Sequence, residues 1–402
     1  MAILAGRGRT EEENVQVASR QAPGNTPDRG AAAESLPAMR PPEAAASDVP
    51  DLQDLRRARD RTAPNSRPVI VVRVAVDALG GDNAPEEVVA GAVEAASASI
   101  QPVLFGPAGL DTGGLELVET TQVLEMDDKP AEAVRAKPDS SLVAACRAVG
   151  EKQADAVVSA GNTGAMLAAC FLELRRLPGV ARPAIAVVMP TKRGPSVLLD
   201  SGANADARPE HLLQFAHMGS VFAEEVLGLR NPIVRLLSIG EEPEKGNQLT
   251  LETHALLAAA DDLNFAGNTE SRNLILGAAD VVVCDGFTGN VSLKLMEGTI
   301  KGVLDALREE IGSSWRGKAG GLLVRPVARH LRQRLDPETY GGAYLLGLRG
   351  LAVIAHGNSS RVAIGNAIRL AARGVEHDVV GRLAQRLPER VLASARSETP
   401  GK

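Results

Sequence analysis

The chain repeats one pattern of apolar and polar positions six times. A short, β-branched apolar run ends in a small loop rich in Gly, Asp and Asn, and a stretch with helical spacing follows. Continuous apolar runs are typical of strands buried on both faces, and their alternation with helices predicts a largely parallel sheet between layers of helices. The six runs are Val69–Val76, Ala156–Ser159, Ser196–Leu199, Ile233–Ile239, Val281–Cys284 and Leu351–Ala355.

The loops that follow these runs are the first candidates for a binding site. Ligands of open α/β sheets bind beyond the carboxyl ends of the strands, so we expect the six loops to share one crevice. Backbone N–H groups at a helix start favour an anion, and glycines let the backbone approach it closely. We expect the substrate to be bound by Gly80, Gly81, Asp82, Asn162, Thr163, Gly164, Asp200, Asn204, Asp285, Gly286, Gly289, Asn358 and Ser359.

Each Asn or Asp in these loops also has a simpler interpretation as a helix N-cap, worth about 1 kcal/mol. A substrate site is favoured because so many of the loops carry such a residue. The asparagines that stand at or near an expected helix start are Asn162, Asn204, Asn247, Asn290 and Asn358.

Three residues are candidates for the chemistry itself. Asn290 lies in one of the loops, and Lys294, one helical turn later, would place an ammonium there that suits phosphate; the alternative is a surface lysine. His356 follows an apolar run directly and could stabilise an oxyanion or act as an acid or base, unless it is a structural histidine. Cys284 could form an acyl-cysteine, but a buried cysteine is usually a small hydrophobic residue.

The helix expected to open at Asn290 has the clearest amphipathic pattern of the chain. Its apolar residues recur every three or four positions, as a helix with one buried face requires. The stripe would serve the core or a dimer interface, and it comprises Leu293, Met296, Ile300, Val303, Leu307 and Ile311.

Residues 312–336 change character, because leucines and valines there alternate with arginines and lysines. A basic amphipathic segment is typical of contact with a membrane surface or an acidic partner, although an ordinary solvated helix has the same pattern. The residues that we expect to make such a contact are Leu322, Leu323, Val324, Arg325 and Arg329.

Composition divides the chain in two. Residues 1–68 hold 8 of the 24 prolines and no aromatic residue, and such a segment buries too little apolar surface to offset its ordering entropy. We therefore expect a disordered N-terminal extension at 1–68 and one folded domain at 69–402. Within the domain, the PTKRGP stretch at 190–195 resembles a hairpin connection and makes the sheet mixed.

Several function classes are disfavoured by what the chain contains. A net charge of −6 and 2% aromatic residues argue against binding of nucleic acid, and the three cysteines lack metal-ligand spacing. No dinucleotide fingerprint follows the first run, and the P-loop-like stretch at 312–319 lacks its Ser or Thr. We therefore expect neither a cofactor nor a metal. With neither a signal sequence nor an apolar run long enough to span a bilayer, we expect a cytoplasmic protein.

The loops and the stretches around them contain several long, distinctive sequence blocks. In chain order from about residue 72 to 372, these blocks include VAVDALGGDNAPE, ADAVVSAGNTGAMLAA, LLDSGANADARPEHLLQFAHMG, IGEEPEKGNQL, DVVVCDGFTGNVSLKLMEG, YGGAYLLG and VIAHGNSS. Together they resemble the bacterial phosphate acyltransferase PlsX family.

The resemblance implies an enzyme that moves a long-chain acyl group from acyl carrier protein to inorganic phosphate, and forms acyl phosphate for phospholipid synthesis. It implies a three-layer α/β/α sandwich similar to the isocitrate/isopropylmalate dehydrogenases and the phosphotransacetylases, and a homodimer. It also implies peripheral membrane association through a helical protrusion, and a downstream glycerol-3-phosphate acyltransferase as a partner. Phosphate is then the nucleophile, so the absence of a Ser-His-Asp pattern is expected.

Two other functions agree with the same residues. A phosphotransacetylase-like enzyme would take its acyl group from acyl-CoA, and a non-enzymatic scaffold would organise lipid synthesis at a membrane surface. The chain departs from the family pattern in two places: 68 residues precede the first strand, and Tyr344 stands where relatives often have a smaller residue or a proline. The long start is either a true tail or an early start site.

Overall fold

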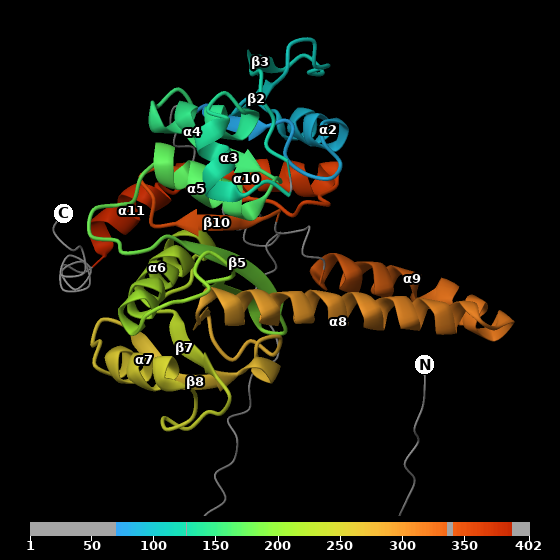
Figure 1. Cartoon of the computed structure of the whole chain (residues 1–402). Helices are drawn as coiled ribbons and strands as arrows, with labels where there is room; N and C mark the ends of the chain where they lie inside the picture. The colour runs from blue at the N-terminus through green and yellow to red at the C-terminus, as the bar shows by residue number, and fades with distance from the viewer. Residues whose placement is uncertain (1–69, 126, 336–340, 388–402) are drawn as a thin grey trace, which may run out of the picture. The chain divides into compact units, whose positions relative to one another are not determined.

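The computed structural model describes residues 70–125, 127–335 and 341–387. The expected disorder of residues 1–68 lies outside these residues. The described residues build one eleven-stranded sheet with helices on both faces (Figure 1). The strands are β1 (Val72–Asp77), β2 (Ile100–Gly106), β3 (Glu116–Glu119), β4 (Ala156–Ser159), β5 (Ala184–Thr191), β6 (Gly194–Leu199), β7 (Ile233–Ser238), β8 (Asn264–Glu270), β9 (Val281–Val283), β10 (Ala343–Leu346) and β11 (Leu351–Ile354).

The helices alternate with most of these strands, as the sequence pattern predicts. A short 3-10 turn, η1 (Ser271–Asn273), follows β8. The helices are α2 (Glu86–Ala95), α3 (Pro130–Ala136), α4 (Ser141–Gly150), α5 (Thr163–Glu173), α6 (Pro209–Leu227), α7 (Gln248–Ala258), α8 (Gly286–Gly312), α9 (Trp315–Leu335), α10 (Arg361–Glu376) and α11 (Val379–Arg386).

The strand order is β3-β2-β1-β4-β11-β10-β5-β6-β9-β7-β8. Most neighbours are parallel, but β10 is antiparallel to both β11 and β5, and β5 is antiparallel to β6 through the expected hairpin. The prediction of a largely parallel, mixed sheet is confirmed. Because of the reversals, β6, β9 and β7 run opposite to β1, β4 and β11.

This strand direction corrects one prediction. The six loops do not share one edge of the sheet, because three follow strands that end at one edge and three follow strands that end at the other. The hydrophobic pattern within a strand does not encode whether its neighbour runs parallel or antiparallel. The sequence analysis therefore identified the loops correctly, but it placed in one crevice what the structure divides into two clusters of loops.

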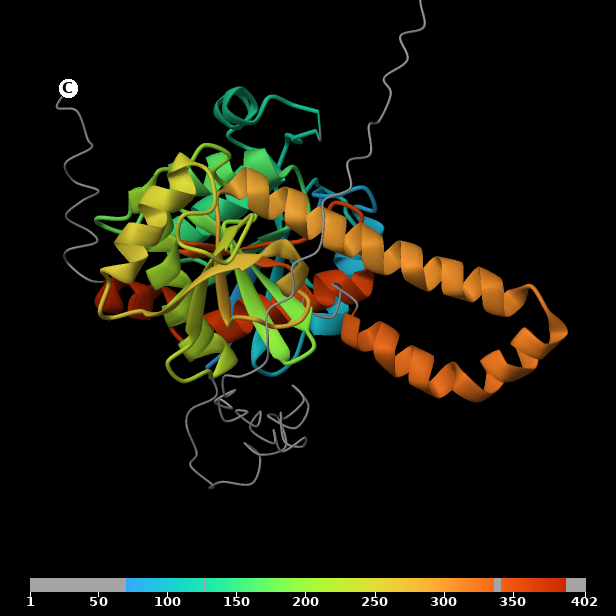
Figure 2. The same cartoon turned by 90° about the horizontal axis from the view of Figure 1, so that it is seen from below.

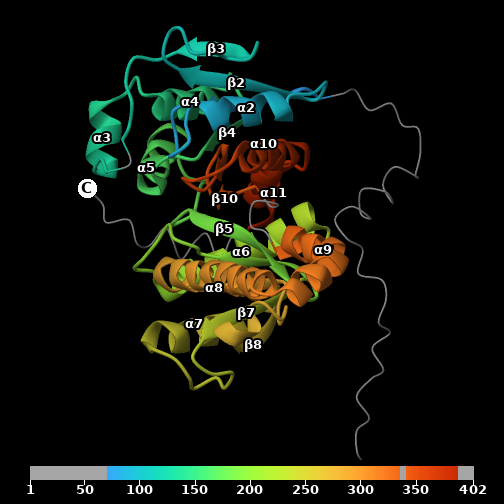
Figure 3. The same ribbon diagram turned by 90° about the vertical axis from the view of Figure 1, so that its right-hand side faces the viewer.

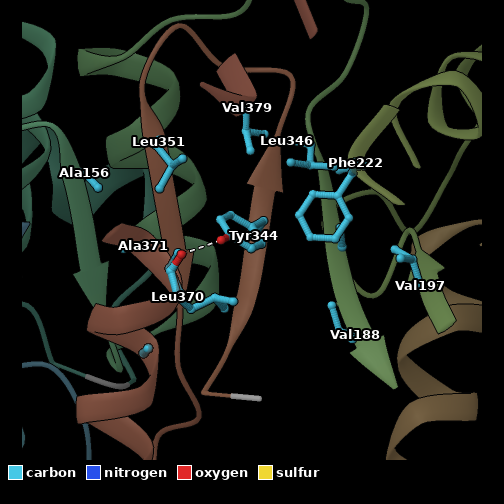
Figure 4. Close-up of a cluster of buried hydrophobic side chains, with 14 of the residues drawn as sticks. Ala156, Val188, Val197, Phe222, Tyr344, Leu346, Leu351, Leu370, Ala371 and Val379 are labelled. Atoms are coloured by element: carbon cyan, nitrogen blue, oxygen red, sulfur yellow. Dashed lines mark hydrogen bonds between the residues drawn. The ribbon is translucent and has the colours of Figure 1, made fainter. Parts of the chain in front are cut away.

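Buried side chains lie on both faces of the sheet. One cluster joins the sheet to α2, α6, α10 and α11, and the opposite clusters join it to α4, α5 and the start of α8. These are the three layers that the sequence predicts. At the centre, the ring of Tyr344 in β10 meets the ring of Phe222 in α6 edge to face, with centroids 4.9 Å apart (Figure 4). The Tyr344 hydroxyl donates to the carbonyl of Leu370 in α10. Tyr344 is thus a core residue that joins β10 to α6 and α10.

Helices α8 and α9 form a pair that runs past the edge of the sheet (Figures 1 and 2). In the view of Figure 3, α8 lies in front of the sheet, below β5 and above β7. It begins at Gly286, four residues before the expected start, because Asp285 is its N-cap and accepts a 2.9 Å hydrogen bond from the N–H of Thr288. No helix among the described residues is both long and apolar enough to cross a membrane.

Candidate functional site

A cavity of about 440 Å³ opens between α5, α8, β5 and the loop after β11. It takes residues from both loop clusters, because α8 starts beside the loop after β6 and then runs toward the loop after β11. Gly202 and Asn290 lie at the first end, and His356 lies at the second. The residues expected from sequence that line the cavity are Thr163, Gly164, Asn290, Lys294, His356, Asn358 and Ser359.

Three titratable side chains meet at the cavity wall. The ammonium Nζ of Lys294 lies 3.2 Å from Oε2 of Glu297 and 3.4 Å from Nδ1 of His356. Nε2 of His356 lies 3.3 Å from Oε1 of the same carboxylate. Lys294 and His356, which are 62 positions apart, are thus brought together by one acid.

Glu297 is the least exposed of the three, at 19% of its side chain against 57% for Lys294 and 46% for His356. Burial acts to raise the pKa of Glu297, but the hydrogen bond from His356 and the charges of His356 and Lys294 outweigh it and hold the pKa below its ordinary value. Glu297 is therefore ionised near neutral pH. Where Nδ1 of His356 accepts a hydrogen bond from the Lys294 ammonium, the Nε2–H of the same ring donates to Glu297.

Glu297 is a functional residue that the sequence reasoning missed. Its signal was present, because it follows Lys294 by three positions and such residues are neighbours on a helix. An i,i+3 Lys–Glu pair is common on solvent-facing helices, however. Only the approach of His356 from a distant strand distinguishes this pair from an ordinary surface contact.

The loops after β1, β4 and β11 form the first cluster. The buried carboxylate of Asp77 accepts hydrogen bonds from the hydroxyls of Ser141 at 2.6 Å and Ser159 at 2.7 Å, and burial raises its pKa although these bonds act to lower it. The N–H of Asp82 donates to the carbonyl of Gly357 at 2.7 Å. Asp77 and Asp82 therefore tie the three loops together.

Gly80, Gly81 and Asp82 lie behind the cavity wall rather than in it. Gly81 has φ of 113°, and a Cβ there would stand 2.9 Å from the Gly357 carbonyl oxygen, so a larger residue would displace the loop that carries His356. Asn162 caps α5 by accepting from the N–H of Ala165 at 3.0 Å. These residues shape the site from outside the cavity.

The loops after β6, β7 and β9 form the second cluster, and Asp200 holds the first of these loops. Its carboxylate is fully buried, and burial raises its pKa although N–H donors surround it. Oδ1 accepts from the backbone N–H groups of Ile185, Gly202 and Ala203 at 3.0–3.1 Å. Oδ2 accepts from the backbone N–H of Asn204 at 2.7 Å and from its side-chain amide at 2.8 Å. Asp200 and Asn204 are thus hydrogen-bonded to each other within the loop after β6. Helix α6 begins five residues after Asn204, at Pro209.

The first turn of α8 packs onto this loop. The N–H of Gly286 donates to the Asn204 carbonyl at 2.7 Å, and a Cβ at Gly289 would overlap the Asp200 carbonyl oxygen at 1.9 Å. Glycine at 289 lets α8 approach closely enough to place Asn290 in the cavity. Asn290 is therefore inside the helix, which Asp285 caps, and not at its start; in the other cluster, Ser360 rather than Asn358 caps α10.

Cys284 lies beside this turn but is 2% exposed, and its Sγ is 3.6 Å from the Asp200 carbonyl oxygen. Burial raises the pKa of the thiol well above its ordinary range, which disfavours the thiolate that an acyl-cysteine would require. Among the described residues, no three His, Cys, Asp or Glu side chains gather as a metal ion would require.

The fold is shared with solved phosphotransacylases. A phosphotransacetylase from Streptococcus pyogenes superposes with a TM-score of 0.51 at 16% identity, over 77% of this chain and 96% of that one. A branched-chain phosphotransacylase from Enterococcus faecalis gives 0.50 at 18% identity, over 76% and 100%. The layers and the sheet therefore define an α/β protein of the phosphotransacylase fold.

The sequence comparisons are more specific. The family model "Fatty acid synthesis protein" matches residues 72–382. A phosphate acyltransferase of Heliobacterium modesticaldum is 45% identical over 80% of this chain and 99% of its own length, and one of Desulfitobacterium hafniense is 48% identical over 79% and 98%. The chain belongs to the phosphate acyltransferase family and is an acyltransferase. This confirms the resemblance that the sequences of its loops indicate.

The role of Asp200 predicts the effect of removing its charge. In Asp200→Asn, the new amide would face the backbone N–H of Asn204 and the side-chain N–H that now donates to Asp200, and would leave these two partly buried N–H groups without their acceptor. We expect the free energy of unfolding in urea to fall by about 2–5 kcal/mol. Asp206→Asn, an exposed change in the same loop, should alter it by less than about 0.5 kcal/mol. Equal effects would show that the carboxylate does not hold the loop.

Proposed function

We propose that this acyltransferase moves a long-chain fatty acyl group from the thioester of acyl carrier protein to inorganic phosphate, and forms acyl phosphate for phospholipid synthesis. The observation that carries the proposal is the meeting of Lys294, Glu297 and His356 on the wall of a cavity whose remaining walls are largely apolar. The names of the family relatives support phosphate as the acceptor.

The chemistry needs no enzyme nucleophile. A phosphate oxygen attacks the thioester carbonyl carbon, the C–O bond forms, and the electron pair of the C–S bond leaves with sulfur as a thiolate. The thiol of cysteine has a pKa near 8.5, far below that of an alcohol, so a thiolate departs without prior protonation and takes its proton from water afterwards. The tasks left to the protein are to hold the phosphate and to stabilise the charge that develops on the carbonyl oxygen.

We assign these tasks by charge and position. Lys294 supplies the positive charge for the phosphate, and His356 and Glu297 hold its ammonium toward the cavity. Asn290, one turn earlier on the same face of α8, supplies an amide donor. Thr163, Asn358 and Ser359 line the cavity from the other cluster and supply further polar groups for the phosphate or the oxyanion.

The α8–α9 pair suits a membrane or protein contact. Leu322, Leu323 and Val324 are 69%, 82% and 49% exposed, and the exposed Arg325 and Arg329 follow them on α9. Exposed apolar side chains beside cations favour an anionic surface. We propose that this segment brings the cytoplasmic enzyme to the membrane periphery or to the acidic carrier protein. We also propose that the enzyme is a homodimer and that a glycerol-3-phosphate acyltransferase consumes its acyl phosphate product.

A second donor is favoured by the structural comparison, because the solved proteins of this fold include a phosphotransacetylase. That similarity supports a thioester of coenzyme A as the alternative donor. The two donors share the thioester and differ in what carries it. A scaffold without activity would use neither.

The reaction is tested with purified full-length protein and hexadecanoyl acyl carrier protein. We expect loss of the thioester that depends on phosphate, with acyl phosphate as the product. The parallel reaction with hexadecanoyl-CoA separates the two donors, and we expect the carrier-protein thioester to react faster. Formation of free fatty acid alone would contradict the transfer to phosphate, and no reaction with either donor would support the scaffold.

The site is tested by shortening the two α8 side chains. We expect Asn290→Ala or Lys294→Ala to lower turnover at least tenfold, which corresponds to about 1.4 kcal/mol or more in the transition state. Lys301→Ala removes an exposed lysine of the same helix outside the cavity and should leave turnover within about twofold. Wild-type rates in both cavity variants would place the active site elsewhere.

The surface contact is tested by flotation with anionic liposomes. We expect the triple variant Leu322→Asp, Leu323→Asp and Val324→Asp to lose most binding, since three charges would oppose insertion of this face and repel the lipid. A protein with Leu251→Asp and Leu276→Asp, two exposed leucines elsewhere, should float as the wild type does. Unchanged binding of the triple variant would remove α9 from the contact.

A further inference from the structure

The apolar half of the cavity has no task in binding phosphate or in stabilising the oxyanion. Val187 and Met189 of β5 form one side, and Met296 and Ile300 of α8 form the side opposite. Lys294 and Glu297 alternate with Met296 and Ile300 along the same helix. The apolar half therefore begins where the polar cluster ends.

This apolar half is closed on the α5 side and open along α8. On the closed side, Ile185, Ala343 and Ile354 are 5%, 8% and 7% exposed and belong to the packed core. Along α8, the apolar stripe rises from 6% exposure at Leu293 to 62% at Val303 and 52% at Leu307. Within the described residues, a long apolar ligand held here would extend along this stripe.

We propose that the apolar stripe of α8 guides the acyl chain of the donor and that Ile300 is the residue that determines its permitted length. The proposal rests on the proposed function, because it assumes that a thioester reacts beside Lys294. The chain runs from the polar cluster past Met296 and Ile300, and leaves the cavity toward Val303.

The geometry of a helix sets where chain length begins to matter. Ile300 lies six positions after Lys294, or about 9 Å along the axis at 1.5 Å per residue. A butanoyl chain is shorter than this distance, and a hexadecanoyl chain is longer. Only the longer chain contacts Ile300, so a change at this residue acts on the longer chain selectively.

The test compares butanoyl and hexadecanoyl thioesters of acyl carrier protein with full-length protein, and follows release of thiol in the presence of phosphate. In Ile300→Trp, a large ring blocks the stripe. We expect kcat/KM for the hexadecanoyl donor to fall at least tenfold, and that for the butanoyl donor to stay within twofold. Ile239→Trp makes the same substitution at a side chain that is 81% exposed in the loop after β7, and should change neither value.

A second variant, Ile300→Asp, places a charge in the stripe without added bulk, and should show the same selectivity. Retained butanoyl transfer in either variant demonstrates that the protein is folded. Equal effects of both substitutions on the two donors, or no effect on the hexadecanoyl donor, would overturn the role of Ile300. Wild-type protein that transfers neither acyl group to phosphate would instead overturn the proposed function.

Discussion

The reversal of strand direction at β10, β5 and β6 is the constraint on which the site depends. Because of it, the polar loops that follow parallel strands lie at opposite edges of one sheet. A single element must then join the two edges. Helix α8 does so: its 27 residues span about 40 Å, against about 20 Å for a strand of six residues. It begins in one cluster and passes His356 of the other.

Each cluster is held by one buried aspartate. Asp77 binds two serine hydroxyls, and Asp200 binds the N–H groups of its own loop and of β5. Burial disfavours the ionised form of both carboxyl groups and raises the pKa of each. The hydrogen-bond donors around them offset part of this desolvation free energy. The two loops are thus ordered from inside the protein. Neither Asp77 nor Asp200 lines the cavity, so both loops are held from behind its wall.

Helix periodicity explains how one helix serves two kinds of ligand surface. Asn290, Lys294 and Glu297 recur at spacings of three and four, and so do Leu293, Met296 and Ile300. The two rows lie side by side on the face that borders the cavity. A charged group and a hydrocarbon can therefore be held against neighbouring strips of one rigid element, which is what the proposed reaction between phosphate and a fatty acyl thioester would require.

The sequence by itself determined the six apolar runs, the helix start near Asn162, the layered α/β class and the family. It also identified Lys294 and His356 separately, from residue type and place. The tertiary structure alone decided the direction of the strands, the two loop clusters, the place of Asn290 inside α8, and the position of Glu297 between Lys294 and His356. The reason is physical: caps and hydrophobic periodicity arise between residues a few positions apart, whereas strand direction and the Lys294–His356 contact arise between residues that only the folded chain brings together.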